Sequence, residues 1–300
     1  MKPFLVLISL FFNLIIYCQS KPVAVIPFSI EKNVIYIYCK VNQTDSLKFM
    51  FDTGADGSVI NTGSERKPNV KINSKSINRG ANGSNEVEQS TGNTVEFGNI
   101  HRNMVSLTLI DFETDAFDGI IGTDLMMGNI LEIDYNTKEI RFFKQDDPSI
   151  SYERYDKMKL HMVDNYPAVE SKLIIEGNEY KGLFGLDSGA DDLLTIAAPY
   201  AKKQKLEEKM RNIGSATARG SDGYESVRPV VLCPIINFSG KYLYNIPISL
   251  SNSKEGIDST EKMAGFFGNN FLKRFNVIFD FKNQSIYFKL NKNLYFDMYE

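Results

Sequence analysis

Short apolar runs separated by polar turns recur along most of the chain. Val34–Val41 (VIYIYCKV) is rich in β-branched and aromatic residues and predicts a strand. The polar segment Asn42–Asp45 predicts a turn into a second strand at Leu47–Phe51. The same pattern returns at Lys172–Ile175 and Tyr180–Leu186, which flank a Gly-Asn turn. Each pair therefore predicts a β-hairpin.

Two further hairpins are predicted near the ends of the two halves. Ile130–Ile133 and Ile140–Phe143 flank a YNTK turn, and Val277–Phe281 and Ile286–Leu290 flank KNQS. One longer segment, Ala197–Asn212, reads as a helix, with Pro199 near its start and Gly214 after its end, and with Leu206, Met210 and Ile213 on its apolar face. The pattern predicts an all-β fold with few short helices.

The chain also repeats itself. Gly119–Phe142 (GIIGTDLMMGNILEIDYNTKEIRF) aligns without a gap with Gly265–Phe288 (GFFGNNFLKRFNVIFDFKNQSIYF). Upstream of these segments, Phe49–Ala55 (FMFDTGA) matches Phe184–Ala190 (FGLDSGA) in the same order. A repeated order of motifs is typical of duplicated structural units. We therefore expect two homologous lobes, residues 21–147 and 165–300, joined by a polar linker at 148–164.

The first twenty residues resemble an export signal. After Lys2, the stretch Phe4–Tyr17 is almost purely apolar but too short to span a bilayer comfortably. We expect a signal peptide at residues 1–20, cut near Ser20–Lys21, and an extracytoplasmic location: periplasm, cell envelope or secreted. A lipid anchor at Cys18 ranks second, since Tyr17 is bulkier than such sites normally accept, and a buried N-terminal helix or strand is the remaining alternative. No other stretch is apolar enough to cross a membrane.

The composition of the chain argues against nucleic-acid binding and against a zinc site. The 300 residues include 34 Lys and Arg against 37 Asp and Glu, a net charge of −3, so no basic field favours nucleic acid. Cys39 and Cys233 remain after the leader; export permits a disulfide between them, but buried free thiols on strands are favoured. The three cysteines and two histidines do not have zinc-site spacing. We expect no metal and no cofactor.

The candidate chemistry lies in a doubled Asp-Thr/Ser-Gly motif. Its members are Asp52-Thr53-Gly54-Ala55 and Asp187-Ser188-Gly189-Ala190, and each follows an apolar strand. A carboxylate in apolar surroundings must be hydrogen-bonded or share a proton. If pseudosymmetry brings Asp52 and Asp187 together, one holds a proton and the other does not, which allows general acid–base catalysis without a metal or covalent intermediate. One such motif alone is common in turns; two in register with a second repeat are far more specific.

These motifs resemble the active-site loops of aspartic peptidases, nearest to the retropepsin-like group. Ile120-Ile121-Gly122 and Phe266-Phe267-Gly268 resemble the hydrophobic-hydrophobic-glycine element of that family. The resemblance covers roughly residues 30–290 and implies two β-barrel-like lobes with the active site between them. It also implies that Asp52 and Asp187 form a catalytic dyad.

The resemblance assigns supporting roles as well. It implies that Thr53 and Ser188 brace the two loops and that Gly54 and Gly189 shape the turns, with Ala55 and Ala190 as loop support. Asp56, Asp191 and Asp192 are expected to be structural, holding loop amides or a cation. Both halves lie in one chain, as in pepsin-like enzymes, so a monomer suffices for the site. Asn269-Asn270 depart from Thr123-Asp124 of the first half.

Flaps over the cleft would be Gly- and Ser-rich hairpins. The candidates are Arg79–Asn85 (RGANGSN) and Gly214–Tyr224 (GSATARGSDGY); both could instead be ordinary mobile loops. His101 and His161 lie outside any nucleophile motif, and the acidic stretch Asp111–Asp118 lacks EF-hand spacing. Two functions remain. The first is an exported aspartic endopeptidase acting on peptide or protein substrates. The alternative is a non-catalytic peptide-binding or scaffold module of the cell envelope.

Overall fold

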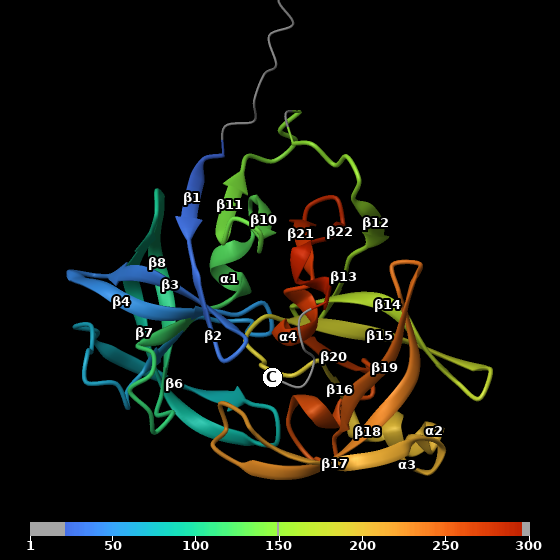
Figure 1. Cartoon of the computed structure of the whole chain (residues 1–300). Coiled ribbons are helices and arrows are strands. Elements are labelled where there is room, and N and C mark those ends of the chain that lie inside the picture. Colours follow the sequence, from blue (N-terminus) through green and yellow to red (C-terminus); the bar gives the residue numbers. More distant parts are fainter. Residues whose placement is uncertain (1–21, 149, 296–300) are drawn as a thin grey trace, which may run out of the picture.

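Three β-sheets build the molecule in the computed structural model, which describes residues 22–148 and 150–295. Figure 1 shows two eight-stranded sheets on the left and right and a six-stranded sheet above them. The predicted all-β fold with few short helices is confirmed. The signal-peptide prediction for residues 1–20 lies outside the described residues.

The left-hand sheet comes from residues 29–121, and we call residues 29–126 the N-terminal lobe. Its strands, in chain order, are β2 (Ser29–Glu31), β3 (Val34–Val41), β4 (Thr44–Phe51), β5 (Val59–Asn61), β6 (Ile72–Arg79), β7 (Ser84–Phe97), β8 (Ile100–Ile110) and β9 (Gly119–Ile121). They are ordered β2-β3-β4-β9-β5-β8-β7-β6, and an extra β3–β7 pairing curls the sheet toward a barrel.

The right-hand sheet comes from residues 161–268, and we call residues 161–272 the C-terminal lobe. Its strands are β13 (His161–Val163), β14 (Tyr166–Ile175), β15 (Asn178–Asp187), β16 (Leu194–Ile196), β17 (Arg211–Arg219), β18 (Glu225–Phe238), β19 (Lys241–Leu250) and β20 (Gly265–Gly268). Their order, β13-β14-β15-β20-β16-β19-β18-β17 with an extra β14–β18 pairing, repeats that of the N-terminal lobe strand for strand.

The six-stranded sheet takes three strands from each half. These are β1 (Ala24–Pro27), β10 (Ile130–Asp134) and β11 (Glu139–Phe143), and β12 (Asp156–Lys159), β21 (Phe275–Asp280) and β22 (Ser285–Leu290). The halves join where β10 runs antiparallel to β21, with Leu131 opposite Phe279. The predicted linker, residues 148–164, contains β12 and β13.

Helices are few and short. They are α1 (Thr123–Met126), α2 (Ala198–Gln204), α3 (Leu206–Lys209) and α4 (Asn269–Leu272), with 3₁₀ turns η1 (Ile257–Ser259) and η2 (Lys292–Tyr295). The predicted single helix Ala197–Asn212 is wrong in two respects. Lys205 adopts a left-handed conformation (φ 52°) that divides it, and the chain enters β17 at Arg211. Ile213 is consequently exposed, although Leu206 and Met210 are buried as expected.

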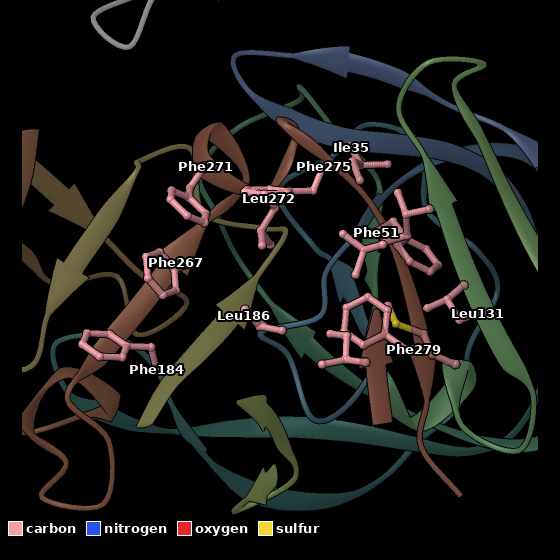
Figure 2. Packing of buried hydrophobic residues seen from close by; sticks show 14 of the residues in the cluster. Ile35, Phe51, Leu131, Phe184, Leu186, Phe267, Phe271, Leu272, Phe275 and Phe279 are labelled. Atoms are coloured by element: carbon pink, nitrogen blue, oxygen red, sulfur yellow. The ribbon is translucent and has the colours of Figure 1, made fainter. Parts of the chain in front are cut away.

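Most of the buried apolar side chains form one continuous cluster that runs through both lobes. In Figure 2, Phe51 and Leu131 lie beside Phe279, and Leu186 lies between them and the phenylalanines of the C-terminal lobe. Phe267 stacks on Phe271 with ring centroids 4.3 Å apart. Because this largest cluster crosses from one lobe to the other, burial of apolar surface stabilises the inter-lobe arrangement as well as each sheet.

Both cysteines of the described residues are free and buried. Cys39 lies on β3 and Cys233 on β18. The preferred prediction of two buried thiols on strands is confirmed. Among the described residues no helix is long and apolar enough to cross a bilayer.

Candidate active site

Both Asp-Thr/Ser-Gly motifs sit where a buried central strand ends. Asp52 follows β4, and Asp187 is the last residue of β15. Each strand lies beside a short parallel strand: Phe51 pairs with Ile121 of β9, and Asp187 with Gly268 of β20. The apolar runs predicted from the sequence thus form the paired strands that precede the two loops, and the two sheets place the loops face to face.

Thr53 and Ser188 bind the two loops to each other. The Thr53 hydroxyl donates to the Leu186 carbonyl (2.7 Å) and accepts from the Ser188 amide (3.0 Å). In the mirror arrangement the Ser188 hydroxyl donates to the Phe51 carbonyl (2.7 Å) and accepts from the Thr53 amide (2.9 Å). Both side chains are fully buried, so these four hydrogen bonds fix the separation of the loops.

Gly54 and Gly189 are required by close approach rather than by an unusual backbone angle. A Cβ on Gly54 would lie 2.4 Å from Asp187 Cγ, and one on Gly189 would lie 2.3 Å from Asp52 Cγ. Each glycine therefore packs against the carboxyl group of the opposite lobe. Any larger residue would push the two carboxyls apart.

The two carboxyl groups are joined by a side-chain hydrogen bond. Asp52 Oδ1 accepts the Gly54 amide (2.7 Å), and Asp187 Oδ1 accepts the amides of Gly189 (2.9 Å) and Ala190 (3.0 Å). Burial raises the pKa of both carboxyls, and the negative charge of Asp52 raises the pKa of Asp187 further, well above its ordinary value. Two carboxyls this close cannot both ionise easily, so the geometry favours one proton shared between them.

The hydrophobic-hydrophobic-glycine elements support the loops from beneath. The Thr123 amide donates to the Ala55 carbonyl (2.8 Å), and the Asn269 amide donates to the Ala190 carbonyl (2.7 Å). These bonds give Ala55 and Ala190 equivalent places in the two lobes. A Cβ on Gly122 would lie 2.7 Å from the Gly57 backbone, so this glycine too allows close packing.

The departure at Asn269 has a structural reason. Its amide group accepts from the Tyr135 hydroxyl (2.5 Å) and donates to the Asn33 carbonyl (2.6 Å), both in the other half of the chain. Asn269 therefore ties the helix beneath the second loop to residues of the first half. Sequence reasoning missed Tyr135, which gave no signal beyond its place in a predicted polar turn.

Other carboxyls around the loops have unequal surroundings. Asp124 accepts from the Ser58 hydroxyl (2.8 Å), and burial raises its pKa. Burial also raises the pKa of Asp192, which accepts from the Thr195 hydroxyl, to about 7. Asp56 and Asp191 are exposed and form no hydrogen bond or ion pair with the described residues. The expectation that these two hold loop amides is wrong.

Metal-binding geometry is absent from the described part of the chain, where no three His, Cys, Asp or Glu side chains converge. A cavity of about 740 Å³ lies on the C-terminal lobe, lined by β12, β14, β15 and the turn after β18. Neither Asp52 nor Asp187 lines it, and it holds no comparable carboxyl pair. The candidate chemistry therefore stays with the joined carboxyls.

Comparison with known proteins agrees with this geometry. Residues 37–125 match the aspartyl protease family. Among 393 solved chains that resemble the structure is an aspartic proteinase from Irpex lacteus, with a TM-score of 0.57 and 13% identity over 89% of this chain and 97% of that one. No curated protein sequence matches significantly. Residues 37–125 therefore resemble the aspartyl protease family, and the chain shares the fold of an aspartic proteinase.

Proposed function

We propose that this protein is an exported aspartic endopeptidase in which Asp52 and Asp187 together activate a water molecule. The single observation that supports this most is the hydrogen-bonded carboxyl pair held by reciprocal contacts from both lobes. The ionised carboxyl accepts a proton from the attacking water, and the protonated one donates to the carbonyl oxygen of the scissile bond. The resting pair holds one proton between its two carboxyls, which titrate together.

The substrate is proposed to be an extended polypeptide segment. Strands β6 and β17 are the last strands of their sheets, so each leaves one edge unpaired in the described structure. An extended peptide can add to such edges through main-chain hydrogen bonds. Export by residues 1–20 remains part of the proposal, as does descent of the two lobes from one duplicated unit.

The test compares wild type with Asp52→Asn and Asp187→Asn on a diverse peptide library from acid to neutral pH, with products read by mass spectrometry. Asp45→Asn makes the same chemical change at an exposed position near the start of the same strand and serves as the control. We expect wild type and the control to cleave, and each dyad variant to lose at least about 10³-fold in kcat/KM. Cleavage by a folded Asp52→Asn variant at the wild-type rate would refute the assignment.

A further inference from the structure

A lysine-lined cavity lies on the C-terminal lobe, apart from the carboxyl pair. It is the cavity of about 740 Å³ between β12, β14, β15 and the turn after β18, and its volume is typical of ligand sites. Figure 1 shows β12 at the right-hand end of the six-stranded sheet, above β14 and β15. We call this space the β12 cavity. The proposed chemistry at Asp52 and Asp187 does not involve it, since neither residue lines it.

Strand β12 presents an unpaired edge to the cavity. The six-stranded sheet ends at β12, whose one strand partner in the described structure is β22. All four residues of β12, Asp156–Lys159, line the cavity. Successive side chains of a strand point to opposite faces, so a space lined by consecutive residues borders the edge of the strand rather than one face. The edge of β12 is therefore open to the cavity.

The register of β12 identifies the backbone groups that point into this space. The Leu160 amide donates to the Gln284 carbonyl (2.9 Å), one position beyond Lys159 in the ladder with β22. Hydrogen-bonded and non-hydrogen-bonded pairs alternate in an antiparallel ladder. Met158 is therefore bonded to β22, whereas the N–H and C=O groups of Lys157 and Lys159 point away from it. An extended chain beside β12 can form main-chain hydrogen bonds with these two residues.

The opposite wall also carries polar groups without partners. On the edge away from β15, β14 pairs with β13 as far as Ala168 and with β18 from Lys172, so residues 169–171 pair with neither strand. The Ser239 hydroxyl, in the turn that borders the cavity, is buried and has no hydrogen-bond partner in the described structure. A buried hydroxyl without a partner is costly, so a polar occupant of the cavity would stabilise it.

Lysines dominate the charge around the cavity. Four lysines line it against two acidic residues: Lys157, Lys159, Lys172 and Lys181, and Asp156 and Glu170. Asp156 is already neutralised by an ion pair with Lys241, and Glu179 forms ion pairs with two of the lining lysines (3.1 and 3.6 Å). Lys157 and Lys159 are exposed and have no ion-pair partner among the described residues. The cavity is thus locally positive in a chain whose net charge is −3.

The free edge and the lysines together select the occupant. Opposite charges at directly paired positions of two strands attract each other, whereas like charges repel. Lysines on an edge strand therefore disfavour pairing with another basic strand, such as a second copy of β12, and favour an acidic one. An extended peptide would form main-chain bonds with the edge and direct alternate side chains toward the lysines.

We propose that the β12 cavity binds an extended acidic segment of a second polypeptide, which pairs with the free edge of β12 and places carboxylates beside Lys157 and Lys159. Main-chain bonds to these two residues set the register of the segment, and the lysine side chains select its charge. The site is separate from the carboxyl pair, and the inference does not depend on the proposed peptidase function.

The first arm of the test follows backbone hydrogen exchange by NMR while a peptide is added. The peptide has eight residues of alternating Thr and Glu with blocked ends, and the protein carries Asp52→Asn to prevent cleavage. We expect the amides of Lys157 and Lys159 to exchange rapidly without the peptide and at least about fivefold more slowly with it. The amides of Met158 and Leu160, which bond to β22, are the internal reference and stay protected throughout. Unchanged exchange at Lys157 and Lys159 with saturating peptide would overturn the pairing.

The second arm measures the dissociation constant of the same peptide by fluorescence anisotropy. We expect the double variant Lys157→Gln/Lys159→Gln to bind at least about threefold more weakly than wild type. Lys202→Gln/Lys203→Gln removes the same charge from exposed positions of α2 outside the cavity, and it should bind like wild type. A peptide of alternating Thr and Gln should bind more weakly than the acidic one. Equal affinity of the two double variants would refute the role of the β12 lysines.

A competition measurement separates this site from the carboxyl pair. A statine-type inhibitor is added to wild-type protein that holds the labelled acidic peptide. We expect the peptide to stay bound, whereas its displacement would place it at the carboxyl pair and overturn the β12 site. An inhibitor that does not bind, or a protein that cleaves no peptide, counts against the proposed function, and the exchange data at Lys157 and Lys159 then decide the β12 site by themselves.

Discussion

Thr53 and Ser188, which are 135 positions apart in sequence, each donate a hydroxyl proton to the other's loop and each accept the other's backbone amide. The four bonds are buried and lie directly beside the two carboxyls. The distance between the carboxyls is thus set by hydroxyl groups of the neighbouring residues. We therefore expect the loss of one hydroxyl oxygen, such as that of Thr53, to disturb the placement of both carboxyls.

Thr53→Val keeps the shape of the side chain and replaces its hydroxyl group with a methyl group. The Leu186 carbonyl and the Ser188 amide then lose their partners in a site without water access, so we expect a loss of about 2 to 5 kcal/mol in the free energy of unfolding and of most activity. Thr53→Ser keeps the hydroxyl and is the matched control, with a much smaller loss. Urea unfolding of both variants measures the difference. Equal stability of Thr53→Val and wild type would show that the hydroxyl exchange does not hold the loops.

The raised pKa of Asp187 has a consequence for stability. A carboxyl whose pKa is higher in the folded protein than the unfolded value of about 3.9 binds its proton more tightly when folded. Stability therefore falls as pH rises from that value through the raised pKa, because the ionised form is the costly one when buried. Asp187→Asn removes this cost, so we expect the variant to gain stability relative to wild type as pH rises from 4 to 8, by on the order of 1 kcal/mol or more.

Urea unfolding at several pH values gives this difference directly. Asp192 and Asp258, with pKa values raised to about 7 and about 6, contribute a slope of the same sign in both proteins. The difference between the two slopes therefore reports on Asp187 and on the part of these two shifts that the Asp187 charge causes. A wild-type advantage that grows with pH would contradict the raised pKa.

Tyr135 and Asn269 give a third prediction. Tyr135→Phe leaves the buried Asn269 Oδ1 without its 2.5 Å partner, so we expect a loss of about 1 to 2 kcal/mol in the free energy of unfolding. Tyr38→Phe removes an exposed hydroxyl without a hydrogen-bond partner in the described structure and should change stability by less than about 0.5 kcal/mol. Thermal or urea unfolding of the two variants measures the difference. If Tyr135→Phe lost no more stability than Tyr38→Phe, the Tyr135–Asn269 hydrogen bond would not stabilise the contact between the two halves.

The cysteines give the last prediction. Burial raises the pKa of the Cys233 thiol to about 12 and that of Cys39 well above its ordinary value, so neither is a thiolate at neutral pH. We expect iodoacetamide to leave both unmodified in the native protein and to modify both in urea, as read by peptide mass spectrometry. A reducing agent should not change the melting temperature. A drop in melting temperature on reduction would reveal a disulfide that this structure does not contain.

Much of the site follows from local sequence. The strand Val34–Val41 has the predicted bounds, and the hairpins at 130–143 and 275–290 form because their alternating apolar positions and polar turns act over a few residues. The repeated Asp-Thr/Ser-Gly motifs also predicted the carboxyl pair from local sequence, because two copies of one local pattern imply two copies of one local structure. The predicted helix at 197–212 is wrong at its C-terminal end because Arg211 and the residues after it pair with β18. This tertiary pairing outweighs the local helix propensity.

What only the tertiary structure decided are the contacts between residues far apart in the chain. No local pattern indicates that the Asn82 side chain hydrogen-bonds to Ser226 and Arg228 of the C-terminal lobe, that Tyr135 meets Asn269, or that β10 pairs with β21. These contacts depend on the relative placement of the lobes, and that placement comes from non-directional burial of one shared apolar core. The sequence by itself determined the two Asp-Thr/Ser-Gly loops, because each is a local pattern that follows an apolar strand. The placement of the two carboxyls relative to each other depends on how the lobes pack.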